Sequence, residues 1–279
     1  MKEERAVDLQ KYTTFRMGGT AKIMYTPENE EELLELYNQG KTTYCIGGGS
    51  NLIINTREFD AVVNLRQFNS TITAGEYGCF YVGASTHLQH LILTINQAGY
   101  GGIEYLFSVP GLVGGAVVMN AGRGKAYHCT IGDYIQRVKV IHNGRIEWIL
   151  RDACHFSYRS SIFQSGEYLI LGVEFKFPKV APVEAEIHRK QRINLCRSRQ
   201  DGSAPNFGTV FCESNKLIMQ AFKYLPIGKG NGICYSTKTA NWMLNKGGSF
   251  TEVMKMLDRV KRVHEIVGAA CRTEVAVWE

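Results

Sequence analysis

The sequence predicts an α+β fold made of consecutive modules, and three observations support this class. Short apolar runs typical of strands alternate with helical stretches over the first 180 residues, two glycine-rich loops interrupt them, and the composition changes near residue 181. Chains that mix strands and helices in this way form sheets covered by helices. We therefore expect three parts, residues 1–70, 71–180 and 181–279.

The first module is expected to have the order β-α-β. Residues 20–26 (TAKIMYT) alternate between apolar and polar as a strand does. Residues 27–39 begin with proline, carry acids in their first turn and repeat apolar residues at helical spacing. Residues 42–46 (TTYCI) predict a second strand, and LIIN and AVVNL predict two more.

The second module is predicted to be richer in strands. Residues 79–84 (CFYVGA) form a strand that leads into a helix over residues 86–99, which a glycine closes. The runs IQRVKVIH and RIEWIL flank Asn143-Gly144, and this dipeptide between two apolar runs indicates a hairpin. Residues 169–177 (LILGVEFKF) alternate strongly and predict the last strand of this module.

The third module is expected to contain both helices and strands. The run VEAEIHRKQRINLCRSRQ predicts a long helix, followed by the loop DGSAPNFG and a strand beginning TVF. Further helices are expected over residues 215–224 and after Ser249 or Thr251, either of which suits the cap position before Glu252. The final run TEVAVWE alternates as a strand does.

Charge and composition narrow the possible partners. The 279-residue chain carries a net charge of +6, and its strongest basic cluster, residues 189–200, has no interleaved aromatic residues that could stack on bases. This cluster is interpreted as the solvated face of a helix, with a nucleic acid or a phosphorylated small molecule as the alternatives. We expect no nucleic-acid partner.

The cysteine pattern and the apolar runs exclude two other classes. None of the eight cysteines forms a CxxC pair, so a zinc site is unsupported and no metal is expected. The first residues, MKEERAVDLQ, lack the apolar core of a signal peptide, and no window approaches the ~20 apolar residues that cross a bilayer. The sequence therefore predicts a cytoplasmic protein with no membrane partner, whose cysteines are mostly buried thiols.

The loop Gly47-Gly48-Gly49-Ser50-Asn51 follows a predicted strand. Consecutive amides without side chains can point into one anion-binding concavity. The loop lacks both the GxGxxG and the GxxxxGK[ST] patterns, so the common nucleotide fingerprints do not apply. Taken alone, a tight turn between strands explains these glycines equally well.

A second glycine-rich run, VPGLVGGAVVMNAG, favours a binding function. It places Gly111, Gly114, Gly115 and Gly122 with Asn120 in apolar surroundings. Two such loops, one in each of two modules, suit a long diphosphate ligand. Close packing of a glycine-rich helix or turn is the alternative explanation.

These motifs together resemble the UDP-N-acetylenolpyruvoylglucosamine reductase (MurB) family over nearly the whole chain. The matching segments, in order, are TTFRMGG (13–19), GGGSNLI (47–53), VPGLVGGAVVMNAG (109–122), YRSSIF (158–163) and TEV (273–275). The resemblance implies a two-part FAD-binding module of the vanillyl-alcohol-oxidase type, at 1–70 and 71–180, followed by a smaller α/β substrate-binding domain at 181–279. The short chain resembles the compact type of the family.

The resemblance also implies the reaction. It is the NADPH-driven, FAD-dependent reduction of the enolpyruvyl ether of a UDP-sugar in peptidoglycan synthesis, with roles in cell shape and cell division. The cofactor provides the hydride, and the protein provides orientation, charge and a proton. The implied FAD contacts are Gly47, Gly48, Gly49, Ser50, Asn51, Gly111, Gly114, Gly115, Asn120, Ala121 and Gly122.

Three residues match the catalytic positions of the family. Arg159 is its arginine, whose planar fork suits a carboxylate and keeps its charge. Glu274 matches the acid near the C-terminus, and Thr209 occupies the position of the serine that donates a proton to C2. Threonine keeps the hydroxyl, although its added methyl restricts χ1. Tyr158 is expected to line the substrate site.

The third module departs from the family pattern around these residues. Cys212 and Glu213 replace a lysine and an asparagine, which removes a cation; Lys216 is a candidate to compensate. The segment Ser236-Thr-Lys-Thr-Ala-Asn-Trp242 keeps Lys238 and Asn241 as candidate substrate contacts. Cys212 is interpreted as an inert thiol, since no histidine lies near it in sequence.

These departures leave alternative functions open. The chain is expected to be the sugar-nucleotide reductase, but a related flavoprotein with another substrate would show the same FAD half with a changed third module. A non-catalytic FAD-binding protein is the alternative from a different class. All three of these functions require the purified protein to bind FAD, whereas a basic nucleic-acid-binding protein would not.

Overall fold

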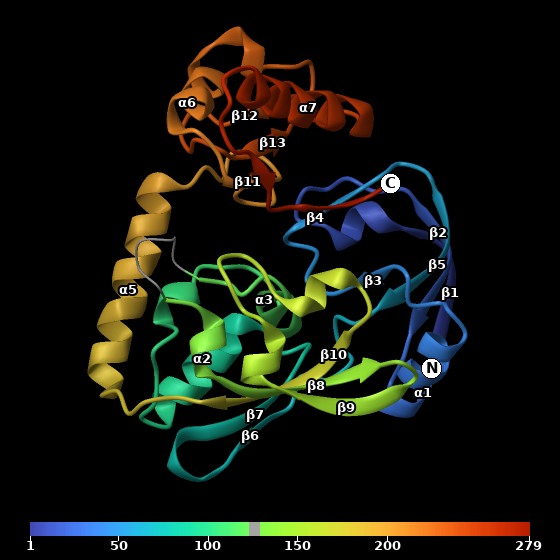
Figure 1. Cartoon of the computed structure of the whole chain (residues 1–279), viewed down its shortest axis with the longest axis vertical. Coiled ribbons are helices and arrows are strands. Elements are labelled where there is room, and N and C mark those ends of the chain that lie inside the picture. The colour runs from blue at the N-terminus through green and yellow to red at the C-terminus, as the bar shows by residue number, and fades with distance from the viewer. Residues whose placement is uncertain (123–128) are drawn as a thin grey trace. The chain divides into compact units, whose positions relative to one another are not determined.

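The computed structural model describes residues 1–122 and 129–279, which form two compact units (Figure 1). Unit 1 consists of Met1–Glu4, Met24–Gly48 and Ala61–Cys196, and unit 2 of Arg5–Ile23, Gly49–Asp60 and Arg197–Glu279. Each unit is therefore assembled from segments that are distant in sequence. The division into three modules at residues 70 and 180 stays a prediction.

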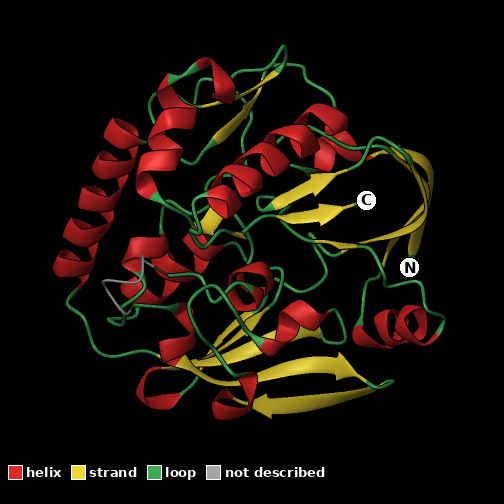
Figure 2. Cartoon of the chain, turned by 45° about the horizontal axis from the view of Figure 1, so that its top comes forward, coloured by secondary structure: helices red, strands yellow, loops and turns green. Residues whose placement is uncertain are grey.

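Unit 1 is built on an antiparallel sheet with the strand order β6-β7-β10-β8-β9. The strands are β6 (Ile72–Ala74), β7 (Cys79–Gly83), β10 (Leu169–Lys176), β8 (Ile135–His142) and β9 (Arg145–Leu150). Helices α2 (Leu88–Gln97) and α3 (Val113–Val118) cover one face, and Figure 2 shows this sheet as a yellow layer below red helices.

The core of unit 1 lies between this sheet and its two helices. Val82, Val173 and Val138 lie opposite one another on β7, β10 and β8 and are fully buried. The apolar face of α2 and the buried side of α3 complete the same core with Leu88, Leu91, Ile92, Ile95, Val113 and Val117. Burial of this apolar surface is the main source of stability for the unit.

Two turns of unit 1 were correctly predicted from glycine and asparagine in the sequence. Asn143 (φ 50°) and Gly144 (φ 71°) both adopt positive φ between β8 and β9, as a two-residue hairpin turn requires. Gly99 (φ 80°) ends α2 in the left-handed conformation. The predicted hairpin and the predicted helix end are thus confirmed.

Two more helices belong wholly or mainly to unit 1. In α1 (Glu30–Asn38), the Asn29 side chain caps the first turn by accepting from the Glu32 amide. The long helix α5 (Pro182–Arg199) carries the basic cluster. Most of this helix is exposed, as expected, but Arg189 donates to the Asn96 side chain of α2 and Arg192 Nε donates to Ser108 Oγ at 2.8 Å.

A second sheet, with the order β1-β2-β5-β3, contains residues assigned to both units. Its strands are β1 (Lys2–Asp8), β2 (Thr20–Thr26), β5 (Glu58–Asn64) and β3 (Cys45–Ile46). Strand β1 was not predicted, because KEERAVD has few apolar residues and no strand-like alternation. The strand predicted over residues 42–46 is shorter, and only its last two residues pair with β5.

Unit 2 contains two helices and three pairs of short strands. The pairs are β11 (Phe211–Glu213) with β14 (Arg272–Thr273), β12 (Ile233–Tyr235) with β13 (Met243–Asn245), and β4 (Leu52–Ile54) with β15 (Ala276–Trp278). The helices are α6 (Lys216–Tyr224) and α7 (Phe250–Ile266). Ser249 caps α7 by accepting from the Glu252 amide at 3.2 Å, which confirms the first of the two predicted caps.

The core of unit 2 combines residues from all three of its segments. Phe15, Ile53, Phe211 and Val260 are among its buried residues.

Single-turn 3-10 helices connect the elements of the whole chain: η1 (Leu9–Tyr12), η2 (Glu76–Gly78), η3 (Glu104–Leu106), η4 (Ile131–Tyr134), η5 (Arg151–Cys154), η6 (Ile162–Ser165) and η7 (Pro226–Gly228). Among the described residues, no helix combines the length and apolar character needed to span a bilayer.

The prediction of a single C-terminal strand over TEVAVWE is wrong, because the structure has two strands there, separated by Glu274 and Val275. The Glu274 carbonyl accepts from the Asn51 side chain at 3.1 Å, and the Val275 side chain is buried in the core. These two contacts turn the chain away from β11 and toward β4, so it pairs with two different strands in succession.

Candidate active site

The two glycine-rich loops contact each other within unit 1. A Cβ atom added to Gly48 would lie 3.1 Å from the Cα atom of Gly111, and one added to Gly47 would lie 3.6 Å from Cδ1 of Leu112. The first distance is tighter than ordinary van der Waals contact. Glycine at position 48 therefore allows the two backbones to approach each other.

Arg66 orients the first of these loops. Its Nε donates to the Gly47 carbonyl at 3.1 Å and its Nη2 to the Gly48 carbonyl at 3.5 Å. Because the N–H of a trans peptide points opposite to its carbonyl, the amides of Gly48 and Gly49 point away from Arg66. Within residues 1–122 and 129–279, neither amide donates a hydrogen bond to the backbone. Arg66 could not be recognised from the sequence, because it lies outside the motifs.

Open space lies beside Gly115 at the start of α3, and the hydroxyl of Thr86, whose carbonyl contacts this helix, is a further hydrogen-bond donor. A Cβ atom added to Gly115 would have no heavy atom within 4 Å, whereas one added to Gly114 would lie 3.2 Å from Ala84. The Thr86 carbonyl accepts from Val113 at 2.9 Å, and the buried Thr86 hydroxyl has no hydrogen-bond partner among the described residues. An unmet buried hydroxyl is costly, so it indicates a bound group that supplies a partner.

Bare amides, open space and an unpaired buried hydroxyl thus lie around the two loops. A diphosphate accepts hydrogen bonds through several oxygens and tolerates no side chain between itself and the backbone. The residues present therefore fit the diphosphate of a dinucleotide cofactor. Ala121 and Gly122 continue the second loop, where the Ala121 carbonyl accepts from Ile131 at 2.8 Å.

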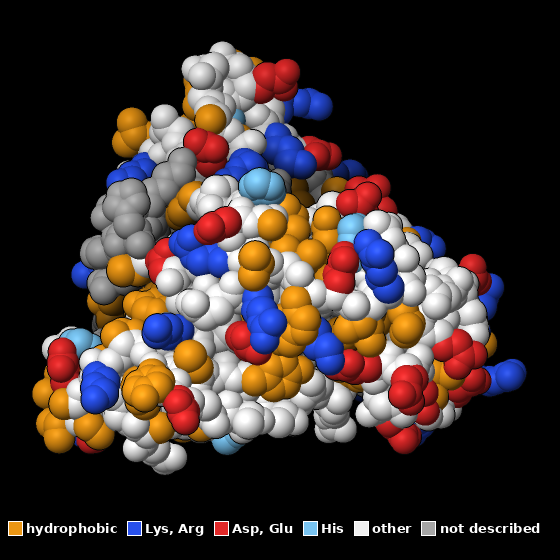
Figure 3. All heavy atoms as spheres, turned by 60° about the horizontal axis from the view of Figure 1, so that its bottom comes forward, with side chains coloured by type: hydrophobic (Ala, Val, Ile, Leu, Met, Phe, Trp, Pro, Cys, Tyr) orange, Lys and Arg blue, Asp and Glu red, His pale blue; other side chains and the backbone are white. Residues whose placement is uncertain are grey.

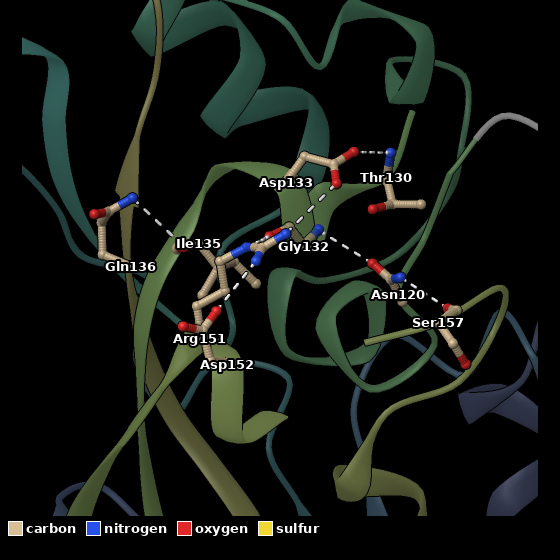
Figure 4. A network of polar contacts seen from close by, with 9 residues as sticks. All are labelled: Asn120, Thr130, Gly132, Asp133, Ile135, Gln136, Arg151, Asp152 and Ser157. Atoms are coloured by element: carbon tan, nitrogen blue, oxygen red, sulfur yellow. Dashed lines mark hydrogen bonds and ion pairs between the residues drawn. The ribbon is translucent and has the colours of Figure 1, made fainter. Parts of the chain in front are cut away.

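Asn120 is buried and holds two segments of unit 1 together (Figure 4). Its Nδ2 donates to the Ser157 carbonyl at 2.8 Å, and its Oδ1 accepts from the Gly132 amide at 3.1 Å. Figure 4 shows the same cluster continuing through Arg151, whose Nε donates to the Gly132 carbonyl at 2.9 Å. The Asn120 amide, a candidate cofactor contact, therefore organises the backbone beside Arg159.

Arg159 lies at the tip of a tight turn. Ser157 and Ser160 exchange backbone hydrogen bonds of 3.0 and 3.2 Å, which leaves Tyr158 and Arg159 as a two-residue tip. Arg159 adopts φ 54°, a conformation uncommon for residues other than glycine and typical of functional sites when it is held in place. Its Nη2 donates to the Gly122 carbonyl at 2.7 Å, so the guanidinium lies beside the second glycine-rich loop.

The other half of the first loop belongs to unit 2, because the unit boundary falls between Gly48 and Gly49. Gly49 has φ 63°, and a Cβ atom there would lie 1.9 Å from the Tyr12 carbonyl oxygen. Asn51 accepts from Ala276 at 3.1 Å through its carbonyl, in addition to its side-chain bond to Glu274. Asn51 therefore positions the backbone of the candidate acid.

Thr209 and Glu274 lie on neighbouring segments of unit 2. The Glu274 amide donates to the carbonyl of Val210 at 2.8 Å, and Phe211 lies opposite Thr273. Both side chains are half-buried. In the described part of the chain, the Thr209 hydroxyl makes no hydrogen bond, so it is available to a bound molecule. Two residues separated by more than sixty positions in sequence are thus brought together.

Asn241 contacts the same strand from its other side. Its Oδ1 accepts from the Phe211 amide at 3.0 Å and its Nδ2 donates to the Phe211 carbonyl at 2.7 Å. The Asn241 carbonyl also accepts from Val210 at 3.0 Å. Both polar groups of this side chain, a candidate substrate contact, are therefore engaged by the strand that follows Thr209.

The two candidate lysines are exposed. Lys216 is the first residue of α6, whose cap Asn215 accepts from the amides of Leu217 and Ile218. Lys238 donates through Nζ to the Arg197 carbonyl at 3.1 Å. Exposed ammonium groups on flexible stems suit phosphate as point charges.

A buried network that the sequence did not reveal anchors the loop of Lys238. Ser236 is fully buried, and its Oγ donates to Asp201 Oδ2 at 2.5 Å while accepting from the amides of Lys238 and Thr239. Hydrogen bonds from Ser203 and Ser236 hold the pKa of the Asp201 carboxyl below its ordinary value. This charged acceptor fixes the loop that carries Lys238 and Asn241.

Cys212 is half-buried on β11 between these groups. Its Sγ lies 3.4 Å from the Arg272 carbonyl, and desolvation raises the pKa of the thiol above its ordinary value. A raised pKa disfavours the thiolate, which is the nucleophilic form. The geometry therefore agrees with an inert thiol.

Charges on the surface in Figure 3 are of both signs and are interspersed with apolar side chains. Residues 1–122 and 129–279 contain no group of three or more histidine, cysteine or acidic side chains arranged to hold a metal ion. Of the three candidate catalytic residues, Arg159 lies in unit 1, and Thr209 and Glu274 lie in unit 2.

The candidate residues are distributed over both units. Unit 1 holds Gly47, Gly48, Gly111, Gly114, Gly115, Asn120, Ala121, Gly122, Tyr158 and Arg159. Unit 2 holds Gly49, Ser50, Asn51, Thr209, Lys216, Lys238, Asn241 and Glu274. In unit 1, Gly48 contacts Gly111, and Arg159 separately contacts Asn120 and Gly122. In unit 2, Asn51 contacts Glu274, which is linked to Asn241 through Val210.

Known proteins resemble this chain over nearly its whole length. Residues 21–149 match the model of a FAD binding domain. The UDP-N-acetylenolpyruvoylglucosamine reductase of Thermotoga maritima is 31% identical over 96% of this chain and 95% of its own length. That of Moorella thermoacetica is 30% identical over 97% of this chain and 91% of its own.

Solved structures lead to the same family. The crystal structure of UDP-N-acetylenolpyruvylglucosamine reductase (MurB) from Thermus caldophilus matches with a TM-score of 0.80 and 26% identity, covering all of both chains. The match to a FAD binding domain and this whole-chain likeness confirm the predicted fold class. Because the sequence relatives share about a third of their residues with this chain over almost their full length, the chain belongs to the UDP-N-acetylenolpyruvoylglucosamine reductase family.

Proposed function

We propose that this protein catalyses the FAD-dependent reduction of UDP-N-acetylglucosamine enolpyruvate to UDP-N-acetylmuramate in peptidoglycan precursor synthesis. Support comes from the relatives that carry this activity in their names and match almost the whole chain. The observation that carries the mechanism is the placement of Thr209 beside Glu274 through Val210. NADPH as the reductant, the cytoplasm as the location, and roles in cell shape and division belong to the same proposal.

FAD, when bound, supplies the hydride for C3 of the enolpyruvyl group. The residues of unit 1 that would hold it are those around Gly48 and Gly111, with the Thr86 hydroxyl as an additional donor. Their contribution is through the backbone: the Gly48 amide points away from Arg66, and no side chain intervenes. Such preorganised dipoles bind an anion without a cost of reorganisation.

Arg159 would stabilise the negative charge that develops on the substrate carboxylate. Hydrogen bonds to the carbonyls of Asn120 and Gly122 hold its guanidinium beside the second loop. A bidentate fork matches a carboxylate in geometry as well as charge. Tyr158, whose ring centroid lies 5.5 Å from the Arg159 guanidinium carbon, would restrict its movement.

Thr209 would donate the proton to C2. Its hydroxyl is free to bind a ligand, and β-branching limits χ1, so the donor has few alternative positions. Glu274, on the adjacent segment, is the acid that supports this transfer. The exposed ammonium groups of Lys216 and Lys238 would bind the diphosphate of the substrate, in place of the cation absent at position 212.

The experiment separates the two halves of the reaction. Under anaerobic conditions, NADPH should bleach the bound flavin, and the enolpyruvyl substrate should restore its colour. Thr209→Val removes only the hydroxyl, so it should leave bleaching unchanged and slow reoxidation by the substrate ~10²–10⁴-fold, as expected for loss of a general acid. Thr209→Ser keeps the hydroxyl and should remain close to wild type.

Three results would contradict parts of this proposal. Equal reoxidation by Thr209→Val and wild type would exclude Thr209 as the donor. Reoxidation by oxygen alone, without any response to the enolpyruvyl substrate, would indicate a flavoprotein with another substrate. A purified protein without affinity for FAD would exclude the reductase altogether.

A further inference from the structure

Asn241 forms an unusual contact with the strand that carries Thr209. Its side-chain amide both accepts from the Phe211 N–H (3.0 Å) and donates to the Phe211 carbonyl (2.7 Å). In a strand, the N–H and the carbonyl of one residue point to the same side. A planar amide, with one acceptor and a donor, can satisfy both. The side chain thus takes the place of a neighbouring strand.

This contact completes the pairing of β11 on both sides. Phe211 lies opposite Thr273 of β14, and on the other side Thr209 forms an isolated bridge with Trp242. Val210, between them, donates to the Asn241 carbonyl and accepts from the Glu274 amide. The backbone next to Thr209 is therefore fixed between Asn241 and Glu274, so a shift of Asn241 would move Thr209 relative to Glu274.

The segment that carries Asn241 is itself immobilised. Asn241 adopts φ 63°, a left-handed conformation that asparagine tolerates better than most residues. The Asp201 and Ser236 network holds the preceding turn, and Thr239 Oγ1 donates to the Arg199 carbonyl at 2.7 Å. A fixed turn can transmit its position to the strand it contacts.

We propose that Asn241 is a positioning residue that holds the Thr209 hydroxyl at the distance required for proton transfer, and that its amide does not bind the substrate. The inference rests on the proposed function, since it assigns Thr209 the role of donor. It follows from the two hydrogen bonds by which the amide holds the backbone of Phe211. One N–H and one lone pair of the amide are not used by these two bonds, so the experiments below include a test for substrate binding. A displacement of about 1 Å at a reacting group can reduce a rate by about one hundredfold.

Two substitutions test the contact in different ways. Asn241→Gly suits the left-handed φ and removes both hydrogen bonds. Asn241→Asp keeps an acceptor for the Phe211 amide but places an oxygen against the Phe211 carbonyl. Both should slow reoxidation of the flavin by the substrate about 10- to 100-fold, with the KM for the substrate and the bleaching by NADPH unchanged. The matched control is the same pair of substitutions at exposed Asn231, which should have no effect.

The decisive measurement is a double-mutant cycle with Thr209→Val. If Asn241 acts through Thr209, adding Asn241→Gly to Thr209→Val should slow the reaction by less than twofold, roughly the error of such cycles. If Asn241 instead binds the substrate, its loss should raise KM by the same factor with or without Thr209. Either a raised KM or full additivity would overturn the inference.

Amide hydrogen exchange gives a readout that does not depend on turnover. Asn241→Gly should speed exchange in the peptide that contains Phe211, while thermal unfolding and FAD absorbance show that the variant is folded. If the wild-type protein fails to reduce the enolpyruvyl substrate, the proposed function is wrong, and unchanged exchange would then separately show that the contact does not hold the strand.

Discussion

In unit 1 the candidate site consists mainly of backbone, whereas in unit 2 it consists of side chains held in place by other side chains. Gly48 approaches the backbone of Gly111 closely because it has no Cβ atom, and Arg66 holds the carbonyls of Gly47 and Gly48. Thr209 and Glu274 are placed instead by Asn51, Asn241 and a buried aspartate network. The two units therefore use side-chain atoms in opposite ways.

This difference determines which substitutions each unit tolerates. Larger side chains in the glycine-rich loops of unit 1 should impair cofactor binding even when the protein still folds. They would occupy the space in which the loop backbone is proposed to contact the cofactor. Removing atoms from unit 2 should impair the chemistry or the stability, because each hydrogen bond there fixes another residue. Three predictions follow in order of expected effect.

The largest effect is expected for Gly48→Val. Its Cβ atom would lie 3.1 Å from the Cα of Gly111, and its methyl groups would extend further into the loop contact. Overpacking of this kind costs about 1–3 kcal/mol, so the Kd for FAD should rise up to about one hundredfold. Titration of the apoprotein by flavin fluorescence measures it. Gly202→Val, at an exposed position with open space, is the control and should bind FAD normally.

A smaller effect is expected for Gly115→Ala, which should make the protein more stable but weaken its binding of FAD. Alanine is favoured over glycine inside a helix by about 1 kcal/mol, and nothing in the protein lies within 4 Å of the added Cβ. The Tm of the FAD-free protein should therefore increase. If the space belongs to the cofactor, the Kd for FAD should rise about tenfold. A higher Tm together with unchanged FAD affinity would show that the space has another use.

The smallest effect is expected for Asp201→Asn in unit 2. The substitution removes the charge that accepts from Ser203 and Ser236, which should lower the free energy of unfolding at pH 7 by about 1 kcal/mol. Urea denaturation of the variant and the wild type measures the difference.

The pH dependence of that difference is the stronger test. Because the pKa of Asp201 is lower in the folded state, its charge stabilises the protein above the ordinary carboxyl pKa, and this stabilisation is lost as the pH falls through the folded-state value. The stabilities of the wild type and the variant should therefore begin to converge as the pH falls below about 4 and should become equal only below the folded-state pKa. An equal difference at pH 7 and at low pH would mean that the network does not depend on the charge.

Local signals allowed much of the fold to be predicted from sequence. The hairpin at Asn143-Gly144 and the cap at Ser249 depend on conformational preferences of a few adjacent residues, and both are present. The same holds for α5, whose length follows from an uninterrupted helical pattern. The direct contact of the two glycine-rich loops was not predicted, because the sequence indicated only that both could face one diphosphate ligand.

The remaining features depend on partners that are remote in sequence. The break between β14 and β15 follows from Asn51, 223 residues before the Glu274 carbonyl that it holds. Arg66, Asp201 and the contact of Asn241 with Phe211 have no local signature, because ordinary polar residues acquire these roles only through tertiary structure. Thr209, Arg159 and Glu274 were identified by family motif, and their catalytic roles stay predictions.

The parallel pairing of β4 with β15 also has a kinetic consequence. Ala276 lies opposite Leu52, and the core of unit 2 joins Phe15 and Ile53 to residues of α7. Such non-local contacts form late, since the chain must first close a very long loop. On the ribosome, the N-terminal segments of this unit would wait unpaired until the last strand emerges, so a chaperone that shields them at this stage should raise the yield of native protein.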